Sequence, residues 1–145
     1  MQNLELDVEN VQVSIYINIV LNTLKKHKEL SVNKMLLFTY LIKKEKFVPG
    51  KIYTANNTQD VVYKAISMIN GEYLDYCESI KFIIEAIHLL IINNKISLKN
   101  SMLHSITEIE VDKCVYPESL FMEKAIEESK KMSDRQFMKE VIASV

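Results

Sequence analysis

The sequence predicts a mainly α-helical fold, a compact helical domain that carries a small winged-helix-like β-hairpin. Apolar residues recur at steps of three and four over most of the chain, as on one face of an α-helix. The 145 residues include only two glycines and two prolines, fewer turn residues than an all-β sandwich needs. One short segment, 95–106, alternates between apolar and polar residues instead. The length is that of one domain, so we expect residues 1–145 to form a single domain.

The first helix is expected at residues 11–29, with Asn10 as its N-cap and Lys25 near its C-terminal end. Its apolar stripe is expected to contain Val11, Ile15, Leu21 and Leu24. Residues 11–19 also alternate as a β-strand would, and the pattern alone leaves helix and strand open for them. We favour a helix from about Ile15 onward because Val20-Leu21 breaks the alternation.

Two further helices are expected at residues 31–44 and 59–70. Ser31 is a good N-cap for the first of them, and Gly71 is a typical residue after the end of the second. A Pro49-Gly50 turn separates the two. The apolar positions of the helix at 31–44 form one broad face, made of Met35, Leu36, Phe38, Leu41 and Ile42.

The helix at residues 75–93 has the clearest periodicity. It is apolar on more than one side, so we expect it to be the central helix of the fold. The hairpin follows directly at residues 95–106, and Lys99-Asn100 is its candidate turn because asparagine tolerates a positive φ. A helix followed by a small hairpin is typical of the end of a winged-helix unit.

Two helices complete the chain, at residues 117–131 and 134–143. Pro117 is a common first helical residue, and Ser133 to Gln136 has the form of a capping box. Their apolar side belongs either to the core or to a partner groove, and it is therefore a candidate partner interface: Phe121, Ile126, Phe137, Met138 and Ile142.

The composition argues against an enzyme. Two glycines 21 positions apart leave no phosphate-binding loop, dinucleotide fingerprint or nucleophile elbow. The order Cys77, His88, His104, Cys114 has no zinc-site spacing, so we expect neither a metal site nor a cofactor. Glu85 and His88 lie one helical turn apart, and we expect them to face solvent rather than to act as an acid–base pair.

The formal net charge of −1 does not indicate bulk binding of nucleic acid. Arg135 is the only arginine, which disfavours sequence-specific reading of bases. Any contact with DNA would come from local lysine clusters, and the possible contact residues are Lys43, Lys44, Lys46, Lys95 and Lys99.

The location is expected to be cytoplasmic. Two cysteines without a CxxC motif suit a reduced compartment, and the acidic N-terminus does not resemble a signal peptide. The most apolar run, 80–92, is too short and too charged to span a membrane, so no membrane contact is expected.

Several segments together resemble the small middle component of bacterial ABC three-component systems, including that of Lamassu-type anti-phage defence. Tyr16 to Leu24 is similar to the opening helix of that family, and Leu30 to Ile42 to its second apolar segment. Ser79 to Leu98 resembles its helix-then-wing passage, and Phe121 to Met132 its late helix, with Phe137 to Val141 as its tail. The Asn-Pro often found in the first segment is absent, and the basic residues after the second are only lysines.

The resemblance implies a non-catalytic adaptor subunit of an anti-phage (antiviral) defence complex. Such a subunit joins an ABC ATPase similar to SMC (structural-maintenance-of-chromosomes) or Rad50 proteins to an effector, often a nuclease, and its wing could approach double-stranded DNA held by the ATPase. A winged-helix transcription regulator is the alternative, but the helix before the wing has Lys81 as its one basic residue other than histidine. A small binding protein of the toxin–antitoxin type is a further alternative.

Overall fold

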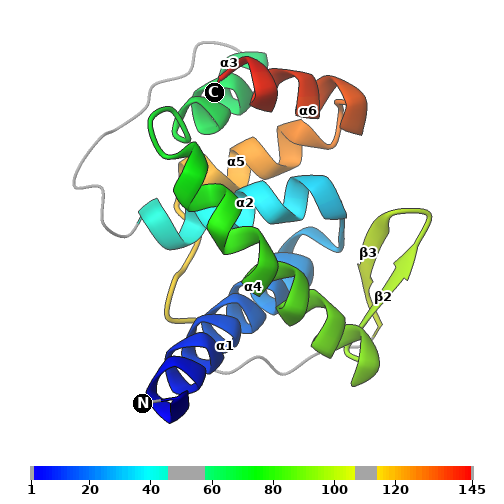
Figure 1. The fold of residues 1–145 in the computed structure, drawn as a ribbon. Helices are drawn as coiled ribbons and strands as arrows, with labels where there is room; N and C mark the ends of the chain where they lie inside the picture. The colour runs from blue at the N-terminus through cyan, green and yellow to red at the C-terminus, as the bar shows by residue number, and fades with distance from the viewer. Residues whose placement is uncertain (1, 46–57, 107–113, 145) are drawn as a thin grey trace.

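The computed structural model describes residues 2–45, 58–106 and 114–144. Within these ranges the fold is mainly helical with one small antiparallel sheet, which confirms the predicted fold class (Figure 1). The elements in chain order are α1 (Gln2–His27), β1 (Glu29–Ser31), α2 (Val32–Glu45), α3 (Thr58–Ser67), α4 (Tyr73–Ile92), β2 (Ile96–Lys99), β3 (Met102–Ser105), α5 (Leu120–Ser129) and α6 (Asp134–Ala143). The predicted Pro49-Gly50 turn lies outside the described residues.

The long helix α1 begins at Gln2, so Asn10 lies inside it and is not its N-cap. Residues 11–19 are helical, and the strand alternative for them was wrong. The predicted apolar stripe was right at Leu24, which is buried, but Val11 is exposed, and Ile15 and Leu21 are half-buried. The residues of α1 that face the core recur at helical spacing and are Val13, Tyr16, Ile19, Val20, Thr23, Leu24 and His27.

The sheet has the strand order β1-β3-β2, with all neighbours antiparallel. Strand β1 was not predicted, because its three residues are too few for an alternating pattern to be recognised. Lys28 adopts a φ of 74°, which ends α1 and turns the chain into β1. The Val32 backbone N–H donates to the carbonyl oxygen of Ser101 at 3.0 Å, so the start of α2 is fixed to the tip of the hairpin.

The hairpin turn lies at Asn100-Ser101, one residue later than predicted. Lys99 pairs with Met102, and both residues between them have a positive φ, 52° and 63°. A two-residue turn with two positive φ angles matches the right-handed twist of the strands, and asparagine accepts that conformation more readily than lysine does. Lys99 therefore remains in the strand.

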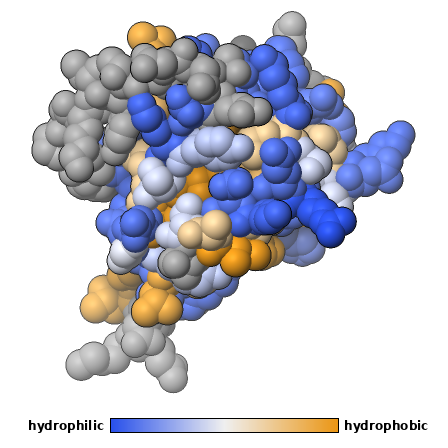
Figure 2. Space-filling model, turned by 90° about the horizontal axis from the view of Figure 1, so that it is seen from above, coloured by the Kyte–Doolittle hydropathy of each residue, from blue (hydrophilic) through white to orange (hydrophobic). Residues whose placement is uncertain are grey.

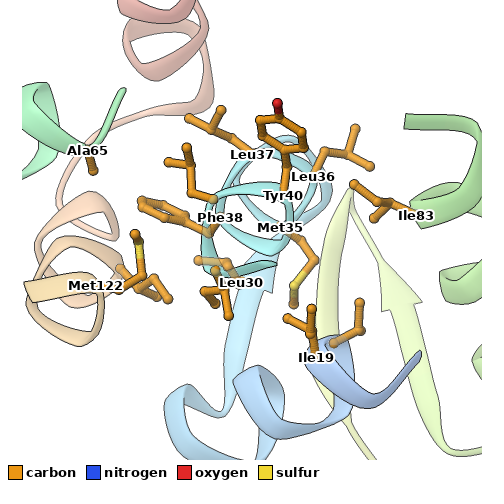
Figure 3. Close-up of a cluster of buried hydrophobic side chains, with 14 of the residues drawn as sticks. Ile19, Leu30, Met35, Leu36, Leu37, Phe38, Tyr40, Ala65, Ile83 and Met122 are labelled. Carbon is orange, nitrogen blue, oxygen red and sulfur yellow. The ribbon is translucent and has the colours of Figure 1, made fainter. Parts of the chain in front are cut away.

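The central helix is α2, not α4 as the sequence suggested. Every residue from Lys34 to Ile42 is buried. Figure 3 shows the side chains of α2 pointing outward in several directions, toward Ile19 of α1, Leu30 of β1, Ala65 of α3, Ile83 of α4 and Met122 of α5. Although α4 is more apolar in composition, only one side of it is buried, because it lies over α1 and α2 at the surface.

Helices α3, α5 and α6 pack together on the side of α2 away from α1 (Figure 1). The Ser133 hydroxyl accepts from the Gln136 backbone N–H at 3.1 Å, which confirms the N-cap of α6. The N-cap of α5 is Ser119, whose hydroxyl accepts from the Met122 N–H at 3.0 Å, so Pro117 precedes the helix instead of starting it. Gly71 has the positive φ (80°) expected of it, but it follows a turn after the end of α3.

A buried lysine links α2 to the loop between the last two helices. Lys34 lies on α2, and its Nζ donates to the Met132 carbonyl oxygen at 2.6 Å in the loop between α5 and α6. Burial lowers the pKa of Lys34, and the charge of Asp134 opposes that effect only in part. No helix in the described part of the chain is both long enough and apolar enough to cross a membrane.

Candidate interaction surfaces

The surface is largely hydrophilic on the face drawn in Figure 2, and hydrophobic residues gather there in separate patches. The chemistry available for catalysis is sparse. Within residues 2–45, 58–106 and 114–144, no group of three or more His, Cys, Asp or Glu residues could hold a metal ion. Cys77 is exposed and Cys114 half-buried, both as free thiols, and Glu85 and His88 face solvent on α4.

The outer side of α4 is the first candidate surface. Ile84 and Ile92 lie two turns apart with 48% and 59% of their surface exposed, while Ile83, Ala86 and Leu90 fill the core on the opposite side. The charged or titratable residues along this outer side are Lys81, Glu85 and His88. The helix that directly precedes the hairpin therefore exposes apolar side chains with few cations.

The hairpin that follows α4 exposes two further apolar side chains. Ile96 and Leu103 are buried, whereas Leu98 is half-exposed on β2 and Ile106 follows β3 with 46% of its surface exposed. Asn94 ends α4 with a φ of 58°, and the Lys95 N–H donates to the Leu90 carbonyl oxygen at 2.9 Å, so the hairpin is held close to the helix end. Lys95 and Lys99 are exposed, as a DNA contact would require.

Lys43 and Lys44 do not join those two lysines. They lie at the C-terminal end of α2, whereas the hairpin lies at its N-terminal end (Figure 1). The Lys43 ammonium donates to the Gln12 side chain and lies over the Tyr16 ring, 5.0 Å from its centroid. Lys46 lies outside the described residues. The five predicted DNA contacts therefore do not form one patch among the residues described.

Lys44 belongs to a polar cluster in a cleft of about 400 Å³ between α1, α2 and α4. Its Nζ is 3.1 Å from Asp75 Oδ2, and the Tyr40 hydroxyl donates to the same oxygen at 2.7 Å. The hydrogen bond from Tyr40, together with Lys44, lowers the pKa of Asp75, and burial raises the pKa of Tyr40. These side chains are ion-paired or hydrogen-bonded to one another, so the cluster holds α4 against α2.

The apolar side of α5 and α6 is mostly core. Ile126 and Phe137 are fully buried, so their assignment to a partner interface was wrong. The Phe137 ring packs against Phe38 of α2 with centroids 5.7 Å apart. Phe121 and Met138 pack against the core and are half-buried, and Ile142, with 66% of its surface exposed, is the one of the five that faces solvent. Periodicity locates the apolar side of a helix but does not tell whether that side meets the same chain or another one.

His27 forms a cluster that spacing alone could not predict, because its partners lie 91 and 100 positions away. Its side chain is 1% exposed at the C-terminal end of α1. Nε2 is 2.9 Å from Glu118 Oε2, and Nδ1 is 3.1 Å from Glu127 Oε2. A neutral imidazole has only one N–H to donate, so two carboxylate partners require the protonated ring.

The pKa of His27 is raised. Burial lowers it, but the hydrogen bonds and charges of Glu118 and Glu127 outweigh burial. Lys130 closes the cluster by donating to the His27 carbonyl oxygen, and Lys26 pairs with Glu123 at 3.0 Å. The cluster joins the end of α1 to α5 and to the residues just before α5, so its role is structural.

Two grooves run along α1 on the side of residues 114–118. One, of about 440 Å³, is lined by Ile19, Ile42 and Glu118, among others. The other, of about 600 Å³, is lined by the apolar residues Val11, Ile15 and Val115 and by polar residues that include Asp7 and Asn18. Tyr116 borders both grooves. The sequence pattern missed them because their second wall lies about 100 positions from α1.

No protein-family model, no curated protein and no solved structure matches this chain. The proposal for its function therefore rests on the sequence and on the surfaces described above.

Proposed function

We propose that this chain is a non-catalytic adaptor subunit of a multiprotein complex. The complex proposed is an anti-phage defence assembly in the cytoplasm, in which the chain links an SMC/Rad50-like ABC ATPase to an effector nuclease. The identity of these partners rests on the resemblance to the middle component of ABC three-component systems. The role as a binding subunit rests on the surface of the molecule.

The observation that carries the proposal is the exposed apolar side of α4. Ile84 and Ile92 each leave about half of their surface in water on the outer side of α4, and Leu98 and Ile106 of the hairpin region are exposed as well. Exposed apolar residues that lie together are typical of protein interfaces, whereas singly scattered ones are ordinary. Burying this surface against a partner would be favourable by about 25 cal/mol for each Å² removed from water.

The same side of α4 disfavours the transcription-regulator alternative. A helix that enters the major groove presents arginine, lysine, asparagine or glutamine to base edges, with further cations on the phosphates. Here the exposed groups of α4 include Lys81 beside two isoleucines and Glu85. Lys95 and Lys99 could add a weak phosphate contact from the hairpin, consistent with DNA held mainly by another subunit.

The test is co-expression with the proteins encoded by the neighbouring genes, followed by affinity purification through this chain. An ABC ATPase is expected to co-purify with the wild-type protein and to be lost with Ile84→Glu. Gln136→Glu is the matched control, because it adds the same charge at an exposed site on α6, where the Gln136 side chain faces solvent. Purification of this chain alone beside an encoded ATPase would contradict the proposal.

A further inference from the structure

The N-terminal half of α1 carries an apolar stripe on the side away from the core. Leu4, Val8 and Val11 are 69%, 55% and 57% exposed, and Ile15 continues the stripe as a half-buried residue. The spacings of four, three and four residues are those of the apolar positions of a coiled-coil heptad. The core-facing residues of α1, such as Tyr16 and Val20, lie on the opposite side of the helix.

The stripe leads into the groove of about 600 Å³ whose second wall is formed by Val115 and Tyr116. Asn18 occupies the next heptad position and also lines the groove. Its buried Oδ1 atom accepts no hydrogen bond from any residue that the structure describes. A buried acceptor without a donor costs about 1–3 kcal/mol, so a partner that supplies a donor after the Asn18 side chain rotates into the groove would bind more tightly.

The charges beside the stripe indicate which kind of partner would bind to it. Asp7 is exposed beside it, Glu5 and Glu9 lie in the same segment of the sequence, and neither lysine nor arginine occurs before Lys25. Parallel pairing of the stripe with the same stripe of a second copy would bring these acidic segments together, which is unfavourable. A partner with cations in the flanking positions would be attracted instead.

We propose that this face of α1 binds an amphipathic helix of another protein, with an apolar heptad stripe flanked by lysine or arginine and a hydrogen-bond donor facing Asn18. Such a helix would lie along α1 between Val11 and Val115, in the manner of a helix in a groove. This inference rests on the proposed function only in treating the chain as a binding subunit, and it concerns α1 rather than α4.

The test uses the full chain and two labelled synthetic peptides of about three heptads, long enough to form a helix on binding. Both peptides have leucine at the apolar positions and one asparagine in the stripe, and their flanking positions are all lysine or all glutamate. Fluorescence anisotropy is expected to show the lysine peptide binding at least about tenfold more tightly at low salt, with the difference shrinking as salt screens the charges.

Val11→Asp is expected to weaken binding of the lysine peptide by about tenfold or more, because it places a charge in the apolar contact. Ile142→Asp is the matched control on α6, where the isoleucine is exposed to a similar degree, and circular dichroism checks that both variants are folded.

Equal affinity for the two peptides, no binding of either, or unchanged binding by Val11→Asp would overturn the inference. A wild-type dimer in ultracentrifugation that Val11→Asp dissociates would overturn it too, by assigning the stripe to a second copy.

Failure of this inference is distinguishable from failure of the proposed function. Ile84→Glu, which tests the adaptor role, lies on α4 and is expected to leave peptide binding unchanged. Loss of the ATPase contact with retained peptide binding would therefore affect only the proposed function. Loss of peptide binding with a retained ATPase contact would contradict only the proposed binding surface on α1.

Discussion

The Nε2 atom of His27 lies 2.9 Å from Oε2 of Glu118, and this buried contact joins two parts of the chain that are 91 positions apart. Glu127 holds the other ring nitrogen, so the imidazole is clamped between two carboxylates. Through this clamp the end of α1 is tied to the start of the C-terminal helices. The fold is therefore stabilised by a protonated histidine as well as by its hydrophobic core.

The first prediction concerns the pH dependence of that clamp. Because the folded-state pKa of His27 is above the unfolded value of about 6.5, its stabilising contribution is complete below that pH and is lost as the pH rises through the folded-state pKa. His27→Gln is expected to reduce the free energy of unfolding by about 2 kcal/mol at pH 6, and by less at pH 9. Urea unfolding at several pH values measures the difference.

His88→Gln is the control for this prediction, because His88 is exposed on α4. It is expected to change stability little at either pH. An NMR titration that places the pKa of His27 below that of an unfolded histidine would show that the clamp does not hold the charged ring.

The second prediction separates core from interface in the C-terminal helices. Phe137→Ala is expected to destabilise the protein by about 3–5 kcal/mol, because it removes a fully buried ring that packs on Phe38. Ile142→Ala, on the exposed side of the same helix, is expected to cost less than about 0.5 kcal/mol. Denaturant unfolding measures both. Similar small effects for the two variants would mean that Phe137 is not in the core.

The third prediction concerns the hairpin turn. Ser101→Gly is expected to stabilise the protein by about 0.4–1 kcal/mol, because the φ of 63° is strained for serine and easy for glycine. Ser97→Gly in the middle of β2 is expected to destabilise it instead, since strand residues need no positive φ. Thermal unfolding of the two variants distinguishes these effects, and stabilisation by both would argue against the turn geometry.

The fourth prediction tests the cap of the last helix. Ser133→Ala is expected to cost about 1 kcal/mol, because the hydroxyl accepts the Gln136 N–H at 3.1 Å. Ser133→Asp is expected to restore most of the loss, since aspartate is an equally good N-cap and carries a charge that suits the helix N-terminus. A denaturant titration in which alanine and aspartate behave alike would show that the cap contributes nothing.

The sequence predicted the helices and the hairpin well because each has a local signal. Periodicity located α4, and the caps at Ser31 and Ser133 lie directly before the helices they were expected to start. The Ser31 hydroxyl accepts the Lys34 N–H at 3.3 Å, even though Ser31 also ends strand β1. Elements of three residues have no such signal, which is why β1 was missed.

Whether one side of a helix is buried depends on contacts with residues that are distant in sequence. A local sequence pattern does not contain that information. The composition of α4 suggested a central helix, but α1, α4, α5, α6 and β1 all pack against α2, and Ile84 and Ile92 of α4 remain exposed. The same limit explains why Ile126 and Phe137 were taken for an interface and why Val11 was placed in the core stripe. The contacts of His27 and the grooves along α1 both depend on residues 114–118, which are distant in sequence.

The central claim is that this chain acts by binding proteins through apolar surfaces rather than by reading DNA. The test is size-exclusion chromatography with light scattering, run at physiological salt on the chain co-expressed with the ABC ATPase that the proposal expects a neighbouring gene to encode. We expect a co-eluting complex that persists with Gln136→Glu and is lost with Ile84→Glu. A chain that elutes alone in every case, and that binds duplex DNA of its own promoter at the same salt concentration, would contradict the claim.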